Sequence, residues 1–159
     1  MKKNQKILII HNIRSTHNVG SIFRTCDAIG IDRIILSGYS PTPLDRFGRV
    51  RSDMAKTALG AEKSIKWETV SNLGKKISEL KKEGFKIVAL EQSEKSIDYK
   101  KYKPKGNIAI ILGEEVNGIT KKLLELADII LEIPMNGKKE SLNVSVATGV
   151  LLYRLFDTN

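Results

Sequence analysis

The sequence predicts an α/β fold, in which a parallel β-sheet is covered by helices on both faces, within a single domain over residues 1–159. Short apolar runs alternate with stretches of helical periodicity along the chain. The apolar runs are continuous, which is typical of strands buried on both faces. The chain is 41% apolar and 28% charged, and no repeat or interdomain linker divides it, as expected for one globular domain.

Six short runs, most of them continuously apolar, are expected to be the strands of this sheet. The fifth of them is the most apolar, with the sequence Ile-Ala-Ile-Ile-Leu. The last one is stopped by Pro134, because a proline cannot donate a hydrogen bond to a ladder. The expected strands are Lys6–His11, 34–36, 65–68, 87–90, Ile108–Leu112 and 129–133.

Five segments between these runs are expected to be helices. In the first segment, Asn18 is a candidate N-cap and Gly30 ends the helical pattern. The last segment is apolar almost all the way round, so burial on several sides is expected. The expected helices are 18–30, 52–59, Leu73–Lys82, Lys121–Leu126 and Val144–Phe156.

The entrance to the last helix is a candidate ligand site. Ser141 and Asn143 stand where a side-chain oxygen can cap free backbone N–H groups. Such a loop before a buried helix fits a ligand cradle, and an ordinary well-capped helix explains it equally well. Ligands of parallel sheets bind beyond the carboxyl ends of the strands. A site is therefore expected at the polar loops after Leu90, Leu112 and Ile133.

Charge and composition restrict the class of protein. A net charge of +9 favours a polyanionic partner, because each phosphate that is neutralised releases counterions. No apolar run approaches the ~20 residues of a membrane span, and the N-terminus has no signal-peptide core. We therefore expect a cytoplasmic protein that is not bound to a membrane. The single cysteine, Cys26, excludes an internal disulfide and a multi-cysteine metal site; it is expected in the core, and no metal is expected.

Few residues stand out as catalytic groups. Arg24 is the charged residue of an otherwise apolar helical pattern, so its guanidinium is expected either at the surface or against a phosphate or oxyanion. Segment 113–118 is rich in glycine but lacks the Lys-Ser/Thr of a P-loop, and its two adjacent carboxylates would repel phosphate. His11 and His17 have no metal-type spacing, and neither is expected to be the catalyst.

Three ordered stretches point to a family when they are taken together. They are Asn18-Val-Gly-Ser-Ile-Phe-Arg24 with Asn12 before it, Leu112-Gly-Glu-Glu-Val-Asn-Gly118, and Ile133-Pro-Met followed by Ser141-Leu-Asn143-Val-Ser-Val-Ala. They resemble the three motifs of the SpoU (TrmH-like) RNA 2′-O-ribose methyltransferases of the SPOUT superfamily. The third motif is the most specific, and the resemblance covers nearly the whole chain.

The resemblance implies a parallel-sheet SPOUT fold with a deep trefoil knot at the C-terminal end, a rare exception to unknotted topology. It also implies an S-adenosylmethionine pocket made by the knot and a homodimer with the active site at its interface. By motif match, the methyl donor would be lined by Leu90, Gly113, Ile133, Met135 and Leu142. The catalytic residues would be Arg24 with Asn18, Glu115, Ser141 and Asn143.

The function implied by the resemblance is S-adenosylmethionine-dependent methylation of a ribose 2′-hydroxyl in tRNA or rRNA. This reaction needs a proton removed, the developing oxyanion stabilised and the sulfonium aligned for in-line attack. Arginine stays protonated in proteins, so Arg24 is assigned first to clamping a phosphate and the hydroxyl. A second role, removal of the proton through a substrate phosphate, stays open.

Two other classes of protein compete with this one. A non-catalytic RNA-binding or assembly protein on the same fold needs only a basic surface, so the presence of the polar motif residues argues against it. A small-molecule α/β enzyme is disfavoured by the net charge and by the missing acid–base cluster. Two features depart from the family pattern: Glu114-Glu115 replaces the more usual Glu-Gly step, and no added RNA-binding domain is expected within residues 1–159.

Overall fold

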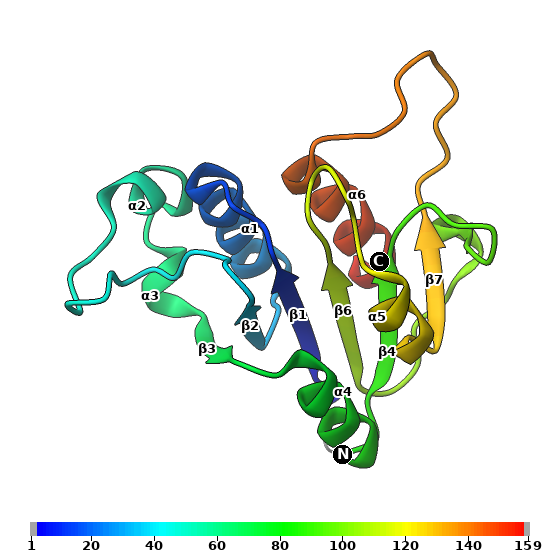
Figure 1. The fold of residues 1–159 in the computed structure, drawn as a ribbon, viewed down its shortest axis with the longest axis horizontal. Coiled ribbons are helices and arrows are strands. Elements are labelled where there is room, and N and C mark those ends of the chain that lie inside the picture. The colour runs from blue at the N-terminus through cyan, green and yellow to red at the C-terminus, as the bar shows by residue number, and fades with distance from the viewer. Residues whose placement is uncertain (1–2, 158–159) are drawn as a thin grey trace.

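Residues 3–157 are described by the structure, which is a computed structural model. Seven strands form one sheet in the order β3-β2-β1-β6-β4-β7-β5, and every neighbouring pair is parallel (Figure 1). The strands are β1 (Lys6–His11), β2 (Arg33–Ser37), β3 (Lys66–Val70), β4 (Lys86–Leu90), β5 (Ile97–Asp98), β6 (Ile108–Leu112) and β7 (Ile129–Glu132). The predicted α/β fold with a parallel sheet is therefore confirmed.

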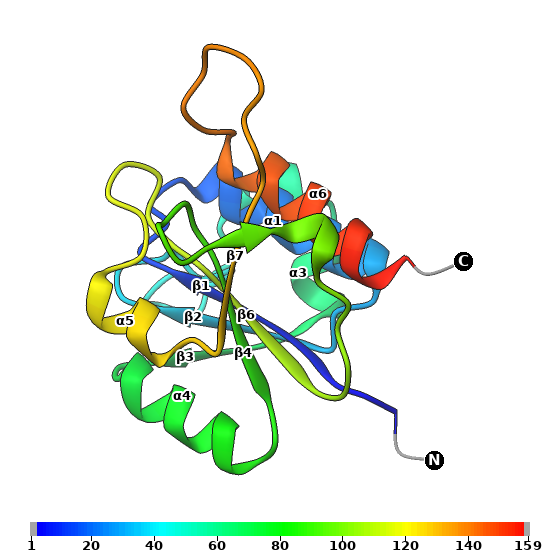
Figure 2. The same ribbon diagram turned by 90° about the vertical axis from the view of Figure 1, so that its right-hand side faces the viewer.

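Helices cover both faces of this sheet. One face carries α1 (Thr16–Ile29), α2 (Ser52–Ala58), α3 (Ala61–Ser64) and α6 (Val144–Phe156), and the other carries α4 (Leu73–Lys82) and α5 (Lys121–Leu126). Figure 2 shows α1 and α6 above the strands, with α4 below them and α5 at the left. Among residues 3–157, no helix has the length and apolar character needed to cross a membrane.

Two hydrophobic cores explain why the inner strands β1 and β6 are apolar along most or all of their length. In β1, Ile7 and Ile9 belong to the core under α4, whereas Leu8 and Ile10 belong to the core under α1 and α6. Successive side chains of a strand point to opposite faces, so a strand with a helix layer on each side buries every position. All five residues of β6 are buried for the same reason.

The first helix begins earlier than predicted. Its N-cap is Ser15 and not Asn18, because the Ser15 hydroxyl accepts a hydrogen bond from the Asn18 backbone N–H at 3.1 Å. The cap therefore leaves the Asn18 side chain available for contacts with other segments. Gly30 ends the helix as predicted, with a φ of 74° that glycine adopts without steric cost.

Three short elements were not predicted, because they carry too few residues to show a period. These are α3, β5 and a single 3₁₀ turn over Tyr99–Lys101, labelled η1. The third strand also lies further along the chain than the predicted 65–68, because its residues pair in register with β2 up to Ser37 and Val70. Pairing with a neighbouring strand, and not local sequence, sets these boundaries.

The last helix, α6, is buried on only one side, which corrects the expectation of burial on several sides. Its inner face contributes Leu151, Leu152 and Leu155 to the core, whereas Val150 and Tyr153 are exposed. The helix is therefore apolar on more sides than the described part of the chain buries. The part of the chain that the structure describes leaves an apolar strip of α6 open next to α1.

Candidate functional site

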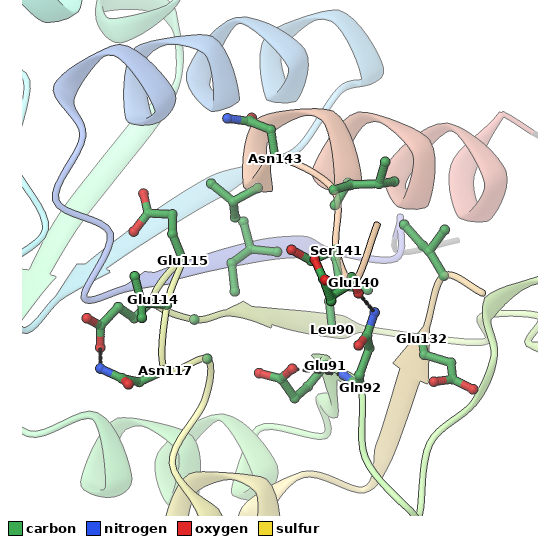
Figure 3. Close-up of a pocket in the computed structure, with 18 of the residues that line it drawn as sticks. Leu90, Glu91, Gln92, Glu114, Glu115, Asn117, Glu132, Glu140, Ser141 and Asn143 are labelled. Carbon is green, nitrogen blue, oxygen red and sulfur yellow. Dashed lines mark hydrogen bonds between the residues drawn. The ribbon is translucent and has the colours of Figure 1, made fainter. Parts of the chain in front are cut away.

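A pocket of about 550 Å³ opens beyond the carboxyl ends of β4, β6 and β7 (Figure 3). Its walls are the residues that follow each of these strands and the first turn of α6. This is the edge at which the sequence predicts a ligand site. Among the residues that line it are Leu90, Gly113, Glu115, Ile133, Met135, Ser141, Leu142 and Asn143, each of which was predicted as a site residue.

One wall of the pocket is the tight loop between β6 and α5. Gly113 and Gly118 close this loop, because a Cβ on Gly113 would lie 2.7 Å from the Gly118 carbonyl carbon. The Gly118 N–H donates to the Glu114 carbonyl at 2.9 Å. Gly118 also has a φ of 67°, a left-handed conformation that favours glycine. These glycines therefore shape the loop itself, besides leaving its backbone accessible to a ligand.

Glu91, the first residue after β4, ties that strand to the same loop. Its Oε2 accepts a hydrogen bond from the Ile119 N–H at 2.8 Å, and its Oε1 accepts one from the Gln92 N–H at 2.8 Å. A Cβ on Gly118 would collide with this carboxylate. The glycine is therefore needed for the glutamate to reach the loop backbone.

The opposite wall is the long exposed segment between β7 and α6. Gln92 reaches this wall, because its side-chain amide donates to the Glu140 carbonyl at 2.8 Å. Asn143 ends the segment as the N-cap of α6, and its Oδ1 accepts from the backbone N–H groups of Ser145 and Val146 at 2.9 and 3.4 Å. The predicted cap at Asn143 is confirmed, whereas Ser141 makes no capping contact with the residues that the structure describes.

A chain of hydrogen bonds joins three of the predicted residues at the rim of the pocket. The Asn143 amide donates to Asn18 Oδ1 at 3.3 Å, and the Asn18 amide donates to Glu115 Oε1 at 3.3 Å. Asn18 belongs to α1, Glu115 to the loop after β6 and Asn143 to the start of α6. Three segments that are distant in the sequence are therefore connected at one point.

The pocket is strongly acidic although the chain as a whole is basic. Five carboxylates line it: Glu91, Glu114, Glu115, Glu132 and Glu140. Within residues 3–157, none of these carboxylates forms an ion pair with a lysine or arginine. This charge favours a ligand that carries a cationic group and disfavours a phosphate.

Arg24 lies apart from this pocket. It is exposed on α1 and lines a second depression together with His17, Lys56 and Tyr153. The structure therefore brings nine of the ten predicted residues to the pocket or its rim and leaves Arg24 on a neighbouring surface. Its side chain lies at the surface, where it is accessible to a ligand.

Glu91 and Gln92 are site residues that the sequence did not predict. Both line the pocket and both hold one of its walls through hydrogen bonds. A signal for them exists, because a polar residue directly after a buried parallel strand stands at the ligand-binding edge of the sheet. The motif match extended only to Leu90, the last residue of that strand.

The cysteine and His11 are packed within the fold and do not line the pocket. Cys26 is fully buried, and burial raises the pKa of its thiol far above the usual range, so the predicted core position is confirmed. His11 Nδ1 lies 2.8 Å from the Ser37 hydroxyl, and burial lowers the pKa of this imidazole. Within residues 3–157, no three or more His, Cys, Asp or Glu side chains are grouped so that they could hold a metal ion.

The fold and the pocket define a class of protein: an α/β domain with a pocket of ligand size between three loops at the carboxyl edge of a parallel sheet. The sequence pattern of the SpoU rRNA methylase family matches residues 5–153. This match covers most of the chain, and the chain belongs to the SpoU rRNA methylase family.

Relatives and solved structures agree with this family. The chain is 34% identical over 150 residues to a TrmH family protein of Staphylococcus aureus, a match that covers 94% of this chain and 58% of the relative. It is 34% identical over 155 residues to the tRNA (guanosine(18)-2′-O)-methyltransferase of Aquifex aeolicus, covering 96% of this chain and 70% of the relative. The crystal structure of an AdoMet-bound rRNA methyltransferase from Sinorhizobium meliloti superposes with a TM-score of 0.86 at 25% identity, covering 96% of this chain and 56% of that one.

Proposed function

We propose that this protein is an S-adenosylmethionine-dependent methyltransferase that methylates a ribose 2′-hydroxyl in tRNA or rRNA. The observation that carries the proposal is the convergence of the three motif segments on one pocket, with Asn18, Glu115 and Asn143 in hydrogen-bond contact at its rim. The family membership and the methyltransferase relatives support the same reaction. The net charge of +9 supports an RNA substrate.

The residues of the pocket fit S-adenosylmethionine. Its carboxylates complement a ligand with a sulfonium and an ammonium group, and its volume falls within the range of small-molecule sites. Leu90, Ile133 and Leu142 offer apolar contacts, and Met135 lies beside them in the same lining. Gly113 leaves the backbone open to close approach. When bound, S-adenosylmethionine supplies an electrophilic methyl group.

The residues of this chain act on the ribose in the proposed mechanism. Arg24 holds a phosphate and the 2′-hydroxyl. The negative charge that develops on the oxygen then faces a guanidinium that stays protonated. Asn18, Glu115 and Asn143 form a hydrogen-bonded set that orients the sugar at the rim of the pocket. Ser141 adds a hydroxyl to the same rim.

A homodimer resolves the separation between Arg24 and the pocket. The depression that Arg24 lines includes the exposed Tyr153 of α6, and Val150 is exposed on the same helix. Apolar side chains in such a strip favour burial against a second copy. In this arrangement Arg24 of one subunit completes the pocket of the other. The active site is then made at the interface, as the family resemblance implies.

The proposal includes a deep trefoil knot formed by the segments around the second and third motifs. The adjacency of β6, β4 and β7 in the sheet, with the pocket between the loops that follow them, is compatible with such threading. A cytoplasmic location belongs to the same proposal, since tRNA and rRNA are modified there.

The test uses the purified protein with S-adenosylmethionine labelled in its methyl group. Total tRNA and total rRNA from a strain that lacks such enzymes are offered separately, and the labelled nucleoside is identified after digestion. A 2′-O-methylated nucleoside in one pool supports the proposal and names the substrate class. Binding of the donor without label in either pool would favour a non-catalytic RNA-binding protein on the same fold.

A further inference from the structure

A basic surface with exposed aromatic rings lies at the carboxyl edge of β2, away from the pocket. Six exposed or partly exposed side chains form what is here called the basic–aromatic patch: Arg14, Tyr39, Arg46, Phe47, Arg49 and Arg51. Figure 1 shows its loop, residues 41–51, projecting at the left beyond α2, far from the orange segment that walls the pocket.

The tip of this loop is held in one conformation by Asp45. Its carboxylate accepts from the backbone N–H groups of Phe47 and Arg49 at 2.8 and 3.0 Å and forms an ion pair with the Arg49 guanidinium at 2.9 Å. The Asp45 N–H donates to the Arg49 carbonyl at 2.8 Å, and Gly48 turns the chain with a φ of 75°. These contacts make a closed turn with Phe47 at its end.

Phe47 is presented to solvent by this turn. Its side chain is 66% exposed, although an aromatic ring of this size gains free energy from burial. The Arg46 and Arg49 guanidiniums lie over the ring, 4.8 and 5.0 Å from its centroid. The result is a stack of one exposed ring and two guanidinium groups, called the Phe47–arginine platform, in which Arg49 is fixed by Asp45. Arg46 has no such ion pair within residues 3–157.

The base of the loop is anchored to the segment that carries the first motif. The Ser40 hydroxyl donates to the Ile10 carbonyl and accepts from the Ile13 N–H, and the Asn12 side chain accepts from the Tyr39 N–H at 3.2 Å. Arg14 from the same segment stacks over the Tyr39 ring at 4.7 Å. The patch is therefore fixed relative to α1 and to the rim of the pocket.

The carboxyl edge of the sheet is divided by charge. The half at β4, β6 and β7 is the acidic pocket, whereas the half at β1 and β2 carries the arginines of the patch. Arg51 has a buried Nε without a hydrogen-bond partner in the described residues, so its guanidinium is not saturated by the protein. A polyanion is attracted to one half of this edge and repelled from the other.

We propose that the basic–aromatic patch binds an unpaired segment of the RNA substrate, with a base stacked on the Phe47–arginine platform and its phosphates held by Arg14, Arg46 and Arg49. Aromatic rings flanked by arginines recognise single-stranded nucleic acid, because every unpaired base offers a face for stacking. Bases within a duplex are covered by their neighbours and offer no such face. The patch therefore selects an RNA loop or end at a distance from the methylated ribose.

This inference rests on the proposed function only for the identity of the partner as RNA. It adds the surface, the residues and the unpaired character of the segment. A protein partner with an acidic surface would use the same arginines. A patch that serves such a partner would not discriminate between single-stranded and duplex RNA. The test is built on that difference.

The test measures binding of a fluorescein-labelled 15-nucleotide oligoadenylate and of a 15-base-pair RNA duplex by fluorescence anisotropy. Phe47→Ala is expected to weaken binding of the single strand about 5- to 100-fold and to leave binding of the duplex unchanged. Phe47→Tyr keeps a ring and serves as the matched control with near wild-type affinity. The Arg46→Gln/Arg49→Gln variant is expected to reduce the slope of log K against log salt by about 1.4.

A charge-matched control removes two exposed lysines from the other face of the sheet, as Lys75→Gln/Lys82→Gln on α4. This variant is expected to bind the single strand better than the double arginine variant. The proposal is overturned if the wild-type protein does not bind oligoadenylate, or if Phe47→Ala binds it within about twofold of wild type.

Methyl transfer is measured separately on the same variants. If no RNA is methylated while single-strand binding still depends on Phe47, the proposed function is contradicted and the inference about the patch is supported. If RNA is methylated and both single-strand binding and methyl transfer are independent of Phe47, the proposed function is supported and the inference about the patch is contradicted. The two inferences are therefore tested by different readouts.

Discussion

The side-chain amide of Asn143 donates a hydrogen bond to Asn18 Oδ1 at 3.3 Å, although the two residues are 125 positions apart in the chain. The same Asn143 side chain caps α6 through its oxygen, so one residue both starts a helix and fixes it to α1. Asn18 extends the contact to Glu115. The geometry at the rim of the pocket therefore depends on a residue whose two functions can be separated by mutation.

Asn143→Ala is expected to lower the free energy of unfolding by about 1 kcal/mol, because the first N–H groups of α6 lose their acceptor. Asn143→Asp keeps the acceptor oxygen and lacks the amide donor to Asn18. It is expected to unfold near the wild-type urea midpoint. Its methyl-transfer activity is expected to be lost, as in Asn143→Ala. Wild-type stability of the alanine variant would refute the capping function, and wild-type donor affinity and activity would refute the function in the site.

Arg24→Ala is expected to lower methyl transfer about 100- to 1000-fold, because the developing oxyanion loses its cation. Donor binding by calorimetry and the elution volume of the protein are expected to stay at wild-type values. Lys56→Ala, in the same depression, is the matched control and is expected to retain activity. Full turnover by Arg24→Ala would remove this residue from the mechanism.

Mixed dimers test whether Arg24 acts across the interface. Arg24→Ala and Asn143→Ala subunits are unfolded together and refolded into mixed dimers. If each pocket uses the arginine of the other subunit, one pocket of a mixed dimer has both residues intact and activity returns. If Arg24 serves its own subunit, every pocket lacks one residue and the mixture stays as inactive as its components.

Val150→Glu is expected to convert the proposed dimer into a monomer, because it places a charge in the apolar strip of α6. Val150 is 37% exposed in the single chain, so the substitution leaves the core intact. Light scattering after gel filtration gives the mass, and circular dichroism verifies the fold. Ser78→Glu, on the exposed side of α4, is the control. A Val150→Glu protein that keeps the mass of a dimer would place the interface elsewhere.

Gly118→Ala is expected to weaken donor binding about tenfold and to lower the free energy of unfolding by about 1–2 kcal/mol. The new methyl group would stand on a left-handed backbone and displace the Glu91 carboxylate, which leaves the Ile119 N–H without its acceptor. Gly137→Ala is the matched control in the opposite wall, because a methyl group on Gly137 would have no atom within 4 Å. Equal donor affinities for the two variants would contradict the role of the Glu91 contact.

The free energy of unfolding is expected to fall as the pH decreases below about 6.5, partly through His11. Burial lowers the pKa of this imidazole in the folded protein, so below its ordinary pKa the unfolded chain binds more protons than the folded one. The loss continues until the pH reaches the lowered pKa. Urea unfolding of wild type and His11→Gln at a series of pH values from neutral to mildly acidic tests this expectation. An identical pH dependence in the two proteins would assign the effect to other groups.

The parts of the fold that could be predicted are those that local sequence controls. The continuous apolar runs indicated the main strands, because a parallel strand between two helix layers has no exposed position. Gly30 and Asn143 marked helix ends through the conformations and hydrogen bonds that these residue types permit. The N-cap of α1 was misplaced because Ser15 and Asn18 are both good caps and only one position agrees with the packing of the helix.

The candidate site was predicted in part, because the motif resemblance named residues without giving their contacts. It identified most of the pocket lining but not Glu91, whose role depends on the loop from a different strand. It implied an active site at a dimer interface, but it did not say which of the named residues would lie outside the pocket of their own chain. The contact of Glu91 and the position of Arg24 both depend on which segments the fold brings together.

The sequence by itself determined the α/β class, the positions of the main strands and helices, and the basic charge of this protein. Only the tertiary structure decided that β1 lies beside β6, that Asn18 meets Glu115 and Asn143, and that one strip of α6 stays uncovered. The physical reason is the range of the interactions. Caps, turns and apolar periodicity act over a few residues, whereas the order of strands and the contacts of their loops depend on how all the apolar faces are buried together.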